Sequence, residues 1–266
     1  MRDYGEDGQL GLETTYQEYI DKLVAIFDEV KRVLKSTGTC WVNLGDTYSG
    51  MKVGNTENVK NPNVESASFI KPKQTVKDKS LIGIPERFAI AMTDSGWIRR
   101  NTIIWHKPSC MPSSATDRFT VDFEYLYFFT KNTKYYFEQQ KEKTLTKDNS
   151  NRDRDISKLN NTPGRTRMAG LTVNNYEYKN KRCVWSINPQ PYSGAHFASY
   201  PEELVATPIK DGCPKGGTVL DPFMGSGTTL KVARDLGCKC IGIELNPHYI
   251  ELAEKRINLR QEIFAI

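Results

Sequence analysis

Helix-like and strand-like hydrophobic patterns alternate along most of the chain. Residues 16–38 carry apolar side chains at helical spacing, and Gly38 stands where a helix would stop. The short apolar run TCWVNLGD (39–46) ends in turn residues and predicts a buried strand. The segment IPERFAIAMTDSG (84–96) predicts a second helix, with Pro85 near its start and Gly96 at its end.

The same alternation continues through residues 97–137. The segment WIRRNTIIWHKP (97–108) predicts another strand, which a loop rich in Pro and Ser follows. The segment DFEYLYFFTKNTKYYF (122–137) has a Lys-Asn-Thr-Lys turn at its centre and predicts a β-hairpin. Helices that alternate with strands indicate an α/β sheet with helices on its faces.

Two polar segments interrupt this pattern. Residues 49–80 carry six lysines and three acidic residues and predict a flexible loop, unless they are an ordinary solvated surface. Residues 139–182 hold 11 Lys and Arg against 5 Asp and Glu, a balance of +6, whereas the whole chain has only +5. We therefore expect 139–182 to be an inserted polar region that divides 1–138 from 183–266, and its charge favours a polyanionic partner over a plain solvated loop.

Composition excludes several classes of protein. With 266 residues, 38% hydrophobic and 26% charged, the chain can bury the core of one large α/β domain. No apolar run approaches the ~20 residues that span a bilayer, so we expect no membrane insertion. The six cysteines lack C-x-x-C spacing and the three histidines form no ligand cluster, which predicts a reducing cytoplasm and no metal.

The stretch GTVLDPFMGSGTTLKVARDLGCKCIGIELNP (217–247) reads as a strand, a glycine-rich turn, a helix and a second strand. The first strand runs into Asp221, and Gly225 and Gly227 allow close backbone approach to a ligand before a helix begins at about Thr228. Glu244 ends the next strand, 23 residues after Asp221, where a carboxylate can accept hydrogen bonds from two ribose hydroxyls. This spacing suits a nucleoside cofactor better than a plain β–α turn.

Three nucleoside ligands compete for this turn. A nucleoside triphosphate site would need Lys directly after the last glycine, but Thr228 and Thr229 stand there. A dinucleotide site would need G-x-G-x-x-G, and the third glycine is missing. S-adenosylmethionine has no phosphate, and its amino-acid end needs a tight glycine turn with an acid such as Asp221 near the ammonium.

The segments LDPFMGSGTT and IGIELNPHYIELAEKR resemble the cofactor motif of the amino-methylating DNA methyltransferases, which make N4-methylcytosine or N6-methyladenine. The likeness extends in the same order over RDYGEDGQLGLE, WVNLGDTY, IPERFAIAMTDSGWIRRNTIIWHKP, MPSSATDRFTVDFEYLYFFTK and VWSINPQPYSGAHFASYPEELV. The order is similar to that of the permuted (β-type) subgroup. There a catalytic half (here 1–138) comes first, a target-recognition region (139–182) follows, and the cofactor half (183–266) comes last.

The resemblance implies a Rossmann-like, S-adenosylmethionine-dependent methyltransferase sheet with a terminal β-hairpin. It also implies residues that line the cofactor pocket, which are Phe197, Ser199, Asp221, Phe223, Gly225, Gly227, Thr228, Glu244 and Asn246. For Asn246, capping of the following helix is an equal alternative. The expected DNA contacts are Lys107, Arg152, Arg154, Arg165, Arg167 and Lys181.

By the same resemblance, the protein is a site-specific methyltransferase that moves a methyl group from S-adenosylmethionine to the exocyclic amine of cytosine (N4) or adenine (N6). The expected partner is double-stranded DNA, with the target base flipped out of the helix. A cognate restriction endonuclease and a homodimer are further expectations. Methylation of RNA or of protein amines on the same fold is a more distant alternative.

One part of the family pattern is absent from the sequence. The family uses a tetrapeptide, (Asp/Asn/Ser)-Pro-Pro-(Tyr/Phe), to accept hydrogen bonds from the target amine, but the 13 prolines of this chain are never adjacent. In the family a segment like RDYG commonly follows that tetrapeptide, so we expect the chain to lack two N-terminal strands, including the one beside the glycine-turn strand. Asp46 and Tyr48 are the substitute catalytic candidates, although Asp46 also suits a turn. The alternative is an inactive remnant that only binds DNA or S-adenosylmethionine.

Overall fold

The computed structural model describes residues 8–50, 76–143, 177–190 and 200–257. The chain divides into two compact units: Met1–Glu138 with Cys183–Ile266 form the main unit, and Gln139–Arg182 form the second. Among the described residues, no helix is long and apolar enough to cross a membrane. Within these same ranges, no group of three or more His, Cys, Asp or Glu side chains is placed to hold a metal ion.

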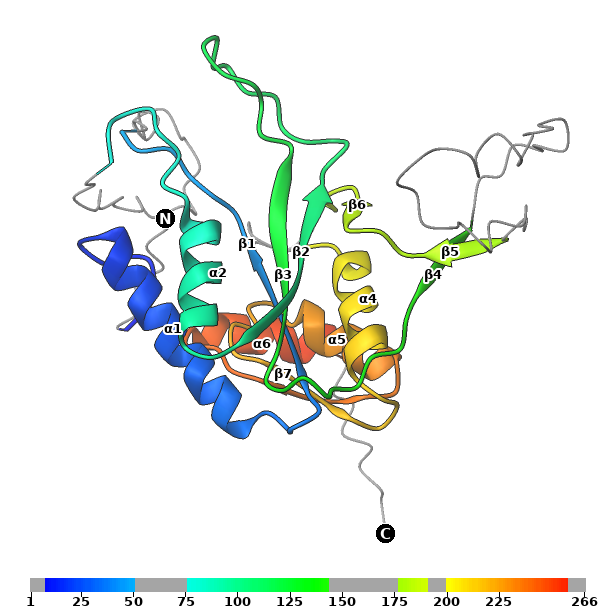
Figure 1. Cartoon of the computed structure of the whole chain (residues 1–266). Coiled ribbons are helices and arrows are strands. Elements are labelled where there is room, and N and C mark those ends of the chain that lie inside the picture. Colours follow the sequence, from blue (N-terminus) through cyan, green and yellow to red (C-terminus); the bar gives the residue numbers. More distant parts are fainter. Residues whose placement is uncertain (1–7, 51–75, 144–176, 191–199, 258–266) are drawn as a thin grey trace, which may run out of the picture. The chain divides into compact units, whose positions relative to one another are not determined.

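The larger sheet of the main unit has the strand order β1-β3-β2-β6 (Figure 1). Its strands are β1 (Thr39–Leu44), β2 (Ile98–His106), β3 (Phe123–Thr130) and β6 (Val184–Ser186). Strand β3 is antiparallel to both β1 and β2, and β6 adds to β2 in parallel. Strands β1 and β2 therefore point the same way, and their carboxyl ends lie at the same edge of the sheet.

The predicted hairpin about Lys131–Lys134 is wrong. Residues 131–140 form no strand after β3. The physical reason is that β1 and β2 already occupy both edges of β3, so a returning strand has no edge to pair with. Instead, Tyr135 and Phe137 lay their rings against Phe128, with centroid distances of 5.7 and 5.6 Å. The antiparallel pair of the sheet is β2 with β3.

Helices cover both faces of this sheet, with α1 and α2 on one side and α4 on the other (Figure 1). Helix α1 (Tyr16–Val33) and helix α2 (Ile84–Asp94) bury a cluster against β1 and β3, made of Leu23, Phe27, Cys40, Val42, Phe88, Ala89, Met92, Trp97, Tyr127 and Phe129. Helix α4 (Glu202–Gly212) contributes Leu204 to a second cluster with Ile103, Trp105, Leu126, Trp185 and Ile187. Alternate residues of each strand thus fill two separate cores.

The glycine-turn segment forms its own small sheet. Strands β7 (Thr218–Asp221) and β8 (Lys239–Gly242) pair in parallel, joined by α5 (Thr228–Asp235) and followed by α6 (Pro247–Ile257). Among the described strands, β7 pairs only with β8, and β1 only with β3.

The second unit contains a two-stranded antiparallel ladder of β4 (Lys141–Lys143) and β5 (Tyr178–Asn180). Lys179 pairs with Glu142 across this ladder, with the Nζ 3.3 Å from Oε1. Residues 144–176 between the two strands lie outside the described part.

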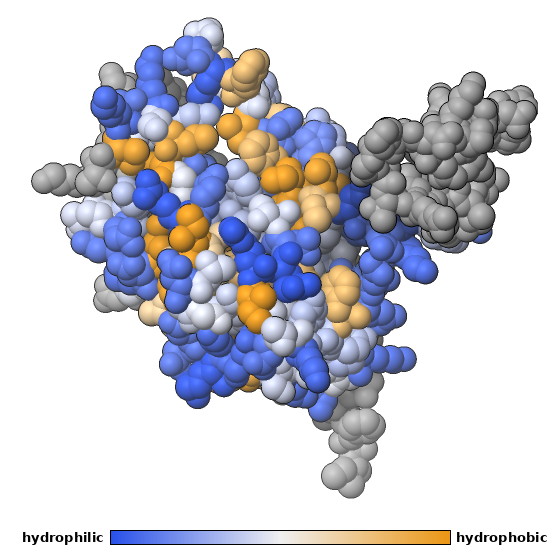
Figure 2. Space-filling model, in the orientation of Figure 1, coloured by the Kyte–Doolittle hydropathy of each residue, from blue (hydrophilic) through white to orange (hydrophobic). Residues whose placement is uncertain are grey.

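On the face of the molecule seen in Figure 2, hydrophobic side chains lie in small patches among hydrophilic ones.

Candidate functional site

The glycine turn between β7 and α5 is the centre of the candidate site. Gly225 and Gly227 have φ angles of +50° and +77°, the left-handed region that favours glycine. Gly227 is the N-cap of α5, and a Cβ there would lie 2.9 Å from the Cβ of Ala253 on α6. Backbone conformation and close packing thus both require glycine at this position.

Two carboxylates hold the turn in place. Asp221, at the end of β7, accepts a hydrogen bond from the Phe223 amide on Oδ1 (3.0 Å). Glu244, two residues beyond β8, accepts the Gly225 amide on Oε2 (3.0 Å) and the Asn246 amide on Oε1 (2.9 Å). Both carboxylates lie where the two parallel strands end, the edge at which α/β sheets bind ligands.

The carboxylate of Glu244 keeps capacity for a ligand. Each of its oxygens accepts one backbone hydrogen bond, and a carboxylate has about four acceptor positions. The Phe223 side chain in the same turn is 45% exposed. A carboxylate with free acceptor positions beside an exposed ring fits the ribose hydroxyls and flat base of a nucleoside.

Tyr200 lies in the segment FASYPE (197–202), which the family resemblance predicts beside the cofactor, although only Phe197 and Ser199 of that segment were named as pocket residues. Its hydroxyl donates to Asp221 Oδ2 (3.1 Å) and lies 2.5 Å from the Thr229 hydroxyl. Burial, followed by the nearby Asp221 charge, raises the pKa of Tyr200, which therefore stays a neutral hydrogen-bond donor. Phe197 and Ser199 of the same segment lie outside the described residues.

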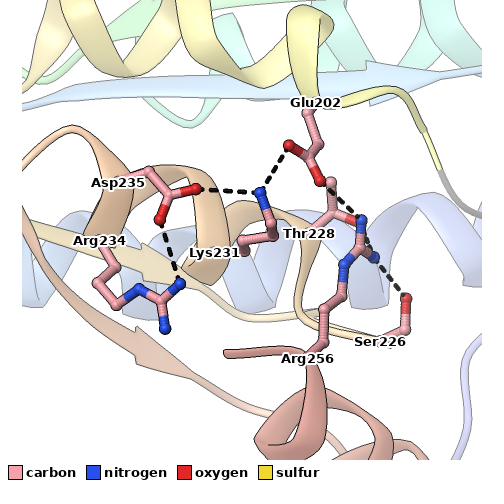
Figure 3. Close-up of polar contacts among 7 residues, drawn as sticks. All are labelled: Glu202, Ser226, Thr228, Lys231, Arg234, Asp235 and Arg256. Atoms are coloured by element: carbon pink, nitrogen blue, oxygen red, sulfur yellow. Dashed lines mark hydrogen bonds and ion pairs between the residues drawn. The ribbon is translucent and has the colours of Figure 1, made fainter. Parts of the chain in front are cut away.

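Behind the turn, a charged network joins α4, α5 and α6 (Figure 3). Arg256 donates to Ser226 (3.2 Å), Thr228 (2.8 Å) and Glu202 (3.2 Å). Lys231 bridges Glu202 (2.9 Å) and Asp235 (3.0 Å). The hydrogen bond from Lys231 lowers the pKa of Glu202. No sequence motif singled out Arg256 or Lys231, because their contacts with Glu202 join elements that are far apart in the sequence.

Two predicted pocket residues have structural partners. Thr228 is buried, with only 3% of its surface exposed. Its hydroxyl accepts a hydrogen bond from Arg256, so this side chain stabilises the turn from the protein interior. The Asn246 side-chain oxygen accepts the His248 amide (2.9 Å) at the start of α6. This is the capping alternative, and it leaves the Asn246 amide nitrogen for a ligand.

The catalytic candidates Asp46 and Tyr48 follow β1. Both oxygens of Asp46 accept the Gly83 amide (3.1 and 3.0 Å), and Oδ1 also accepts the Ile84 amide (3.0 Å). Asp46 therefore caps α2, where a negative charge is favoured by the helix dipole. The Tyr48 ring lies 4.0 Å from the Arg118 guanidinium carbon. These contacts favour structural roles for both residues.

Of the six predicted DNA contacts, the structure describes only Lys107 and Lys181. The Lys107 ammonium pairs with Glu124 and lies 4.4 Å from the Trp105 ring centroid, so internal partners already neutralise it. The Lys181 amide donates to the Gln140 carbonyl (3.1 Å) beside the β4–β5 ladder. The remaining contacts, Arg152, Arg154, Arg165 and Arg167, lie outside the described residues.

Replacing Asp221 or Glu244 with Ala is expected to weaken S-adenosylmethionine binding at least tenfold, about 1.4 kcal/mol. Each change removes acceptors from the turn, and Glu244→Ala also removes those predicted for the ribose. Isothermal titration calorimetry measures the affinity. Glu254→Ala, at an exposed position on α6, is the matched control. Unchanged affinity in both variants would reject this cofactor site.

Asp46 offers a test that separates capping from catalysis. Asp46→Ala should lower the free energy of unfolding by about 0.5–2 kcal/mol, because α2 loses its cap. Asp46→Asn should keep part of that stability, because its single side-chain oxygen can still accept both amides, whereas the charge that the helix dipole favours is lost. Urea unfolding provides the measurement, and Asp28→Ala, exposed on α1, is the control. If Asp46→Asn folds normally but loses methyl transfer, Asp46 is catalytic rather than structural.

Comparisons with known proteins agree with this geometry. A family model described as DNA methylase, for N6 and N4 methyltransferases, matches residues 3–255. The type II methyltransferase M.SmaI of Serratia marcescens is 39% identical over 98% of this chain and 81% of its own length. M.XycI of Xanthomonas campestris pv. cyanopsidis is 39% identical over 97% of this chain and 77% of its own length.

Solved structures show the same fold. PvuII DNA methyltransferase (cytosine-N4-specific) superposes with a TM-score of 0.62 at 19% identity, covering 93% of this chain and 73% of its own. M1.HpyAVI, in a structure titled as its SAM complex, gives a TM-score of 0.52 at 18% identity over 89% and 83% of the two chains. The Rossmann-like α/β fold is thereby confirmed, and the methyltransferase family supports S-adenosylmethionine as the cofactor. The chain belongs to the N6/N4 methyltransferase family of DNA methylases.

Proposed function

We propose that this protein is a site-specific DNA methyltransferase, which transfers a methyl group from S-adenosylmethionine to the exocyclic amine of cytosine or adenine in duplex DNA. The observation that carries the proposal is the glycine turn held by Asp221 and Glu244 at the carboxyl edge of β7 and β8, in a chain of the DNA methylase family. A cognate restriction endonuclease would accompany it, since several relatives are named type II methyltransferases.

The residues of the site suit S-adenosylmethionine better than a nucleotide. The turn offers carboxylates, which would accept hydrogen bonds from ribose hydroxyls at Glu244 and lie near an ammonium at Asp221. The nearby cations Lys231 and Arg256 are paired with Glu202 and with Asp235 or hydroxyls, so their charge is compensated within the protein. When bound, the cofactor would supply an activated methyl group.

The chemistry also requires acceptors for the target amine. An exocyclic amine gains positive charge during methyl transfer, and oxygen acceptors stabilise that charge more strongly than the uncharged ground state. The family tetrapeptide that supplies those acceptors is absent from this sequence. The absence of this tetrapeptide from the sequence favours a second candidate, in which the chain binds DNA or S-adenosylmethionine without turnover.

We also propose that the second unit, Gln139–Arg182, recognises the target sequence. The balance of +6 in this unit, against +5 for the whole chain, leaves the remainder nearly neutral. Basic side chains on a small separate unit would neutralise DNA phosphates, and Arg side chains can also read guanine edges.

Labelled methyl transfer tests the proposed function. The 266-residue chain, incubated with methyl-labelled S-adenosylmethionine and unmethylated genomic duplex DNA, should yield N4-methyldeoxycytidine or N6-methyldeoxyadenosine after digestion and chromatography. Either product supports the proposal and identifies the base. Binding of both ligands without label in the DNA would support the second candidate. Label in C5-methylcytosine, or in RNA alone, would contradict the proposal.

The second unit has a separate test. The test neutralises one basic residue at a time: Arg152, Arg154, Arg165, Arg167 or Lys181. Loss of a phosphate contact should reduce the slope of log DNA affinity against log salt by about 0.9. A base contact should instead relax the choice of target sequence. Lys255→Ala, exposed on α6, is the control. If replacing residues 144–176 with a Gly-Ser linker changes neither DNA affinity nor target choice, recognition lies elsewhere.

A further inference from the structure

The loop between β2 and β3 presents two large apolar side chains to solvent. The loop closes at its base through a hydrogen bond from the Lys107 amide to the Asp122 carbonyl (2.7 Å), and it projects beyond the strand ends (Figure 1). Phe119 is 96% exposed and Met111 is 89% exposed, more than any other large hydrophobic side chain described. Single exposed apolar residues are common, but two such residues on one projecting loop require an explanation.

Contacts on the loop hold it against the neighbouring β1–α2 connection. Arg118 directly precedes Phe119 in the sequence, and its guanidinium lies 4.0 Å from the Tyr48 ring centroid. Asp117 pairs with Lys79 at 2.7 Å. Both anchors come from residues that follow β1, whose carboxyl end lies at the same edge as that of β2. The loop therefore presents its apolar side chains at the ligand-binding edge of the sheet.

Both lysines near the loop are paired with carboxylates, and the Arg118 guanidinium lies over the Tyr48 ring. Lys107 pairs with Glu124, and Lys79 with Asp117. An aromatic ring and a thioether side chain suit the flat, apolar surfaces of stacked bases. Apolar side chains of this kind enter between base steps in proteins that unstack or kink DNA.

We propose that Phe119 and Met111 form an apolar wedge that contacts the base stack of duplex DNA beside the target base. This proposal rests on the proposed function, because it assumes duplex DNA at this edge. The wedge lowers the cost of taking a base out of the stack, since apolar side chains replace part of the lost stacking. In this proposal the main unit unstacks the target base, and the second unit recognises the target sequence.

The test measures binding of the 266-residue chain to a fluorescein-labelled, mixed-sequence duplex over a range of salt concentrations. Phe119→Ala should weaken binding about fivefold or more, in line with loss of one aromatic stacking contact, and Met111→Ala should also weaken it, by a smaller factor. The slope of log affinity against log salt should stay unchanged, because no phosphate contact is lost. Ile90→Ala, 55% exposed on α2, is the matched control and should bind as the parent chain does.

Phe119→Trp adds a direct readout of stacking. This variant should keep DNA affinity, and its added tryptophan fluorescence should be quenched when DNA binds. Parent-like affinity in both Ala variants, no quenching in the Trp variant, or a changed salt slope would overturn the wedge while leaving the methyltransferase proposal intact. Absence of any DNA binding by the parent chain would overturn both.

Discussion

The site depends on two carboxylates that accept backbone amides of the glycine turn. Asp221 accepts the Phe223 amide and Glu244 accepts the Gly225 amide, so both carboxylates stabilise the loop between β7 and α5. Parallel pairing sets this geometry, because Asp221 lies opposite Gly242 and brings Glu244 to the same edge. The Arg256 network and the close contact of Gly227 with Ala253 then hold α5 and α6 against the turn.

The parts that could be predicted from sequence are local. The β7–α5–β8 unit occupies consecutive residues, and its glycines and acids follow from backbone geometry, so the strand–turn–helix–strand unit could be predicted from spacing. The hairpin after β3 was predicted wrongly, because the local pattern could not reveal that β1 and β2 take both edges of that strand. The contacts of Arg256 and the cap by Asp46 join distant segments, so no local pattern indicates them.

The main unit places different chemical features on different elements. The two-stranded sheet carries carboxylates and backbone amides suited to a nucleoside, whereas the edge formed by β1 and β2 carries the loop with Phe119 and Met111. The second unit carries much of the positive charge of the chain. A DNA methyltransferase needs a cofactor pocket, a surface that disturbs base stacking and a basic recognition surface, and the roles we propose for these three segments would divide those tasks among them.

A crystal structure of the chain with S-adenosylmethionine would test the cofactor site most directly. The distances to measure run from the ribose hydroxyls to the Glu244 carboxylate oxygens. Both hydroxyls should lie within hydrogen-bonding distance of Glu244, with the amino-acid end of the cofactor over the turn at Gly225. Cofactor density elsewhere on the chain, with Glu244 contacting only Gly225 and Asn246, would contradict the site proposed for this protein.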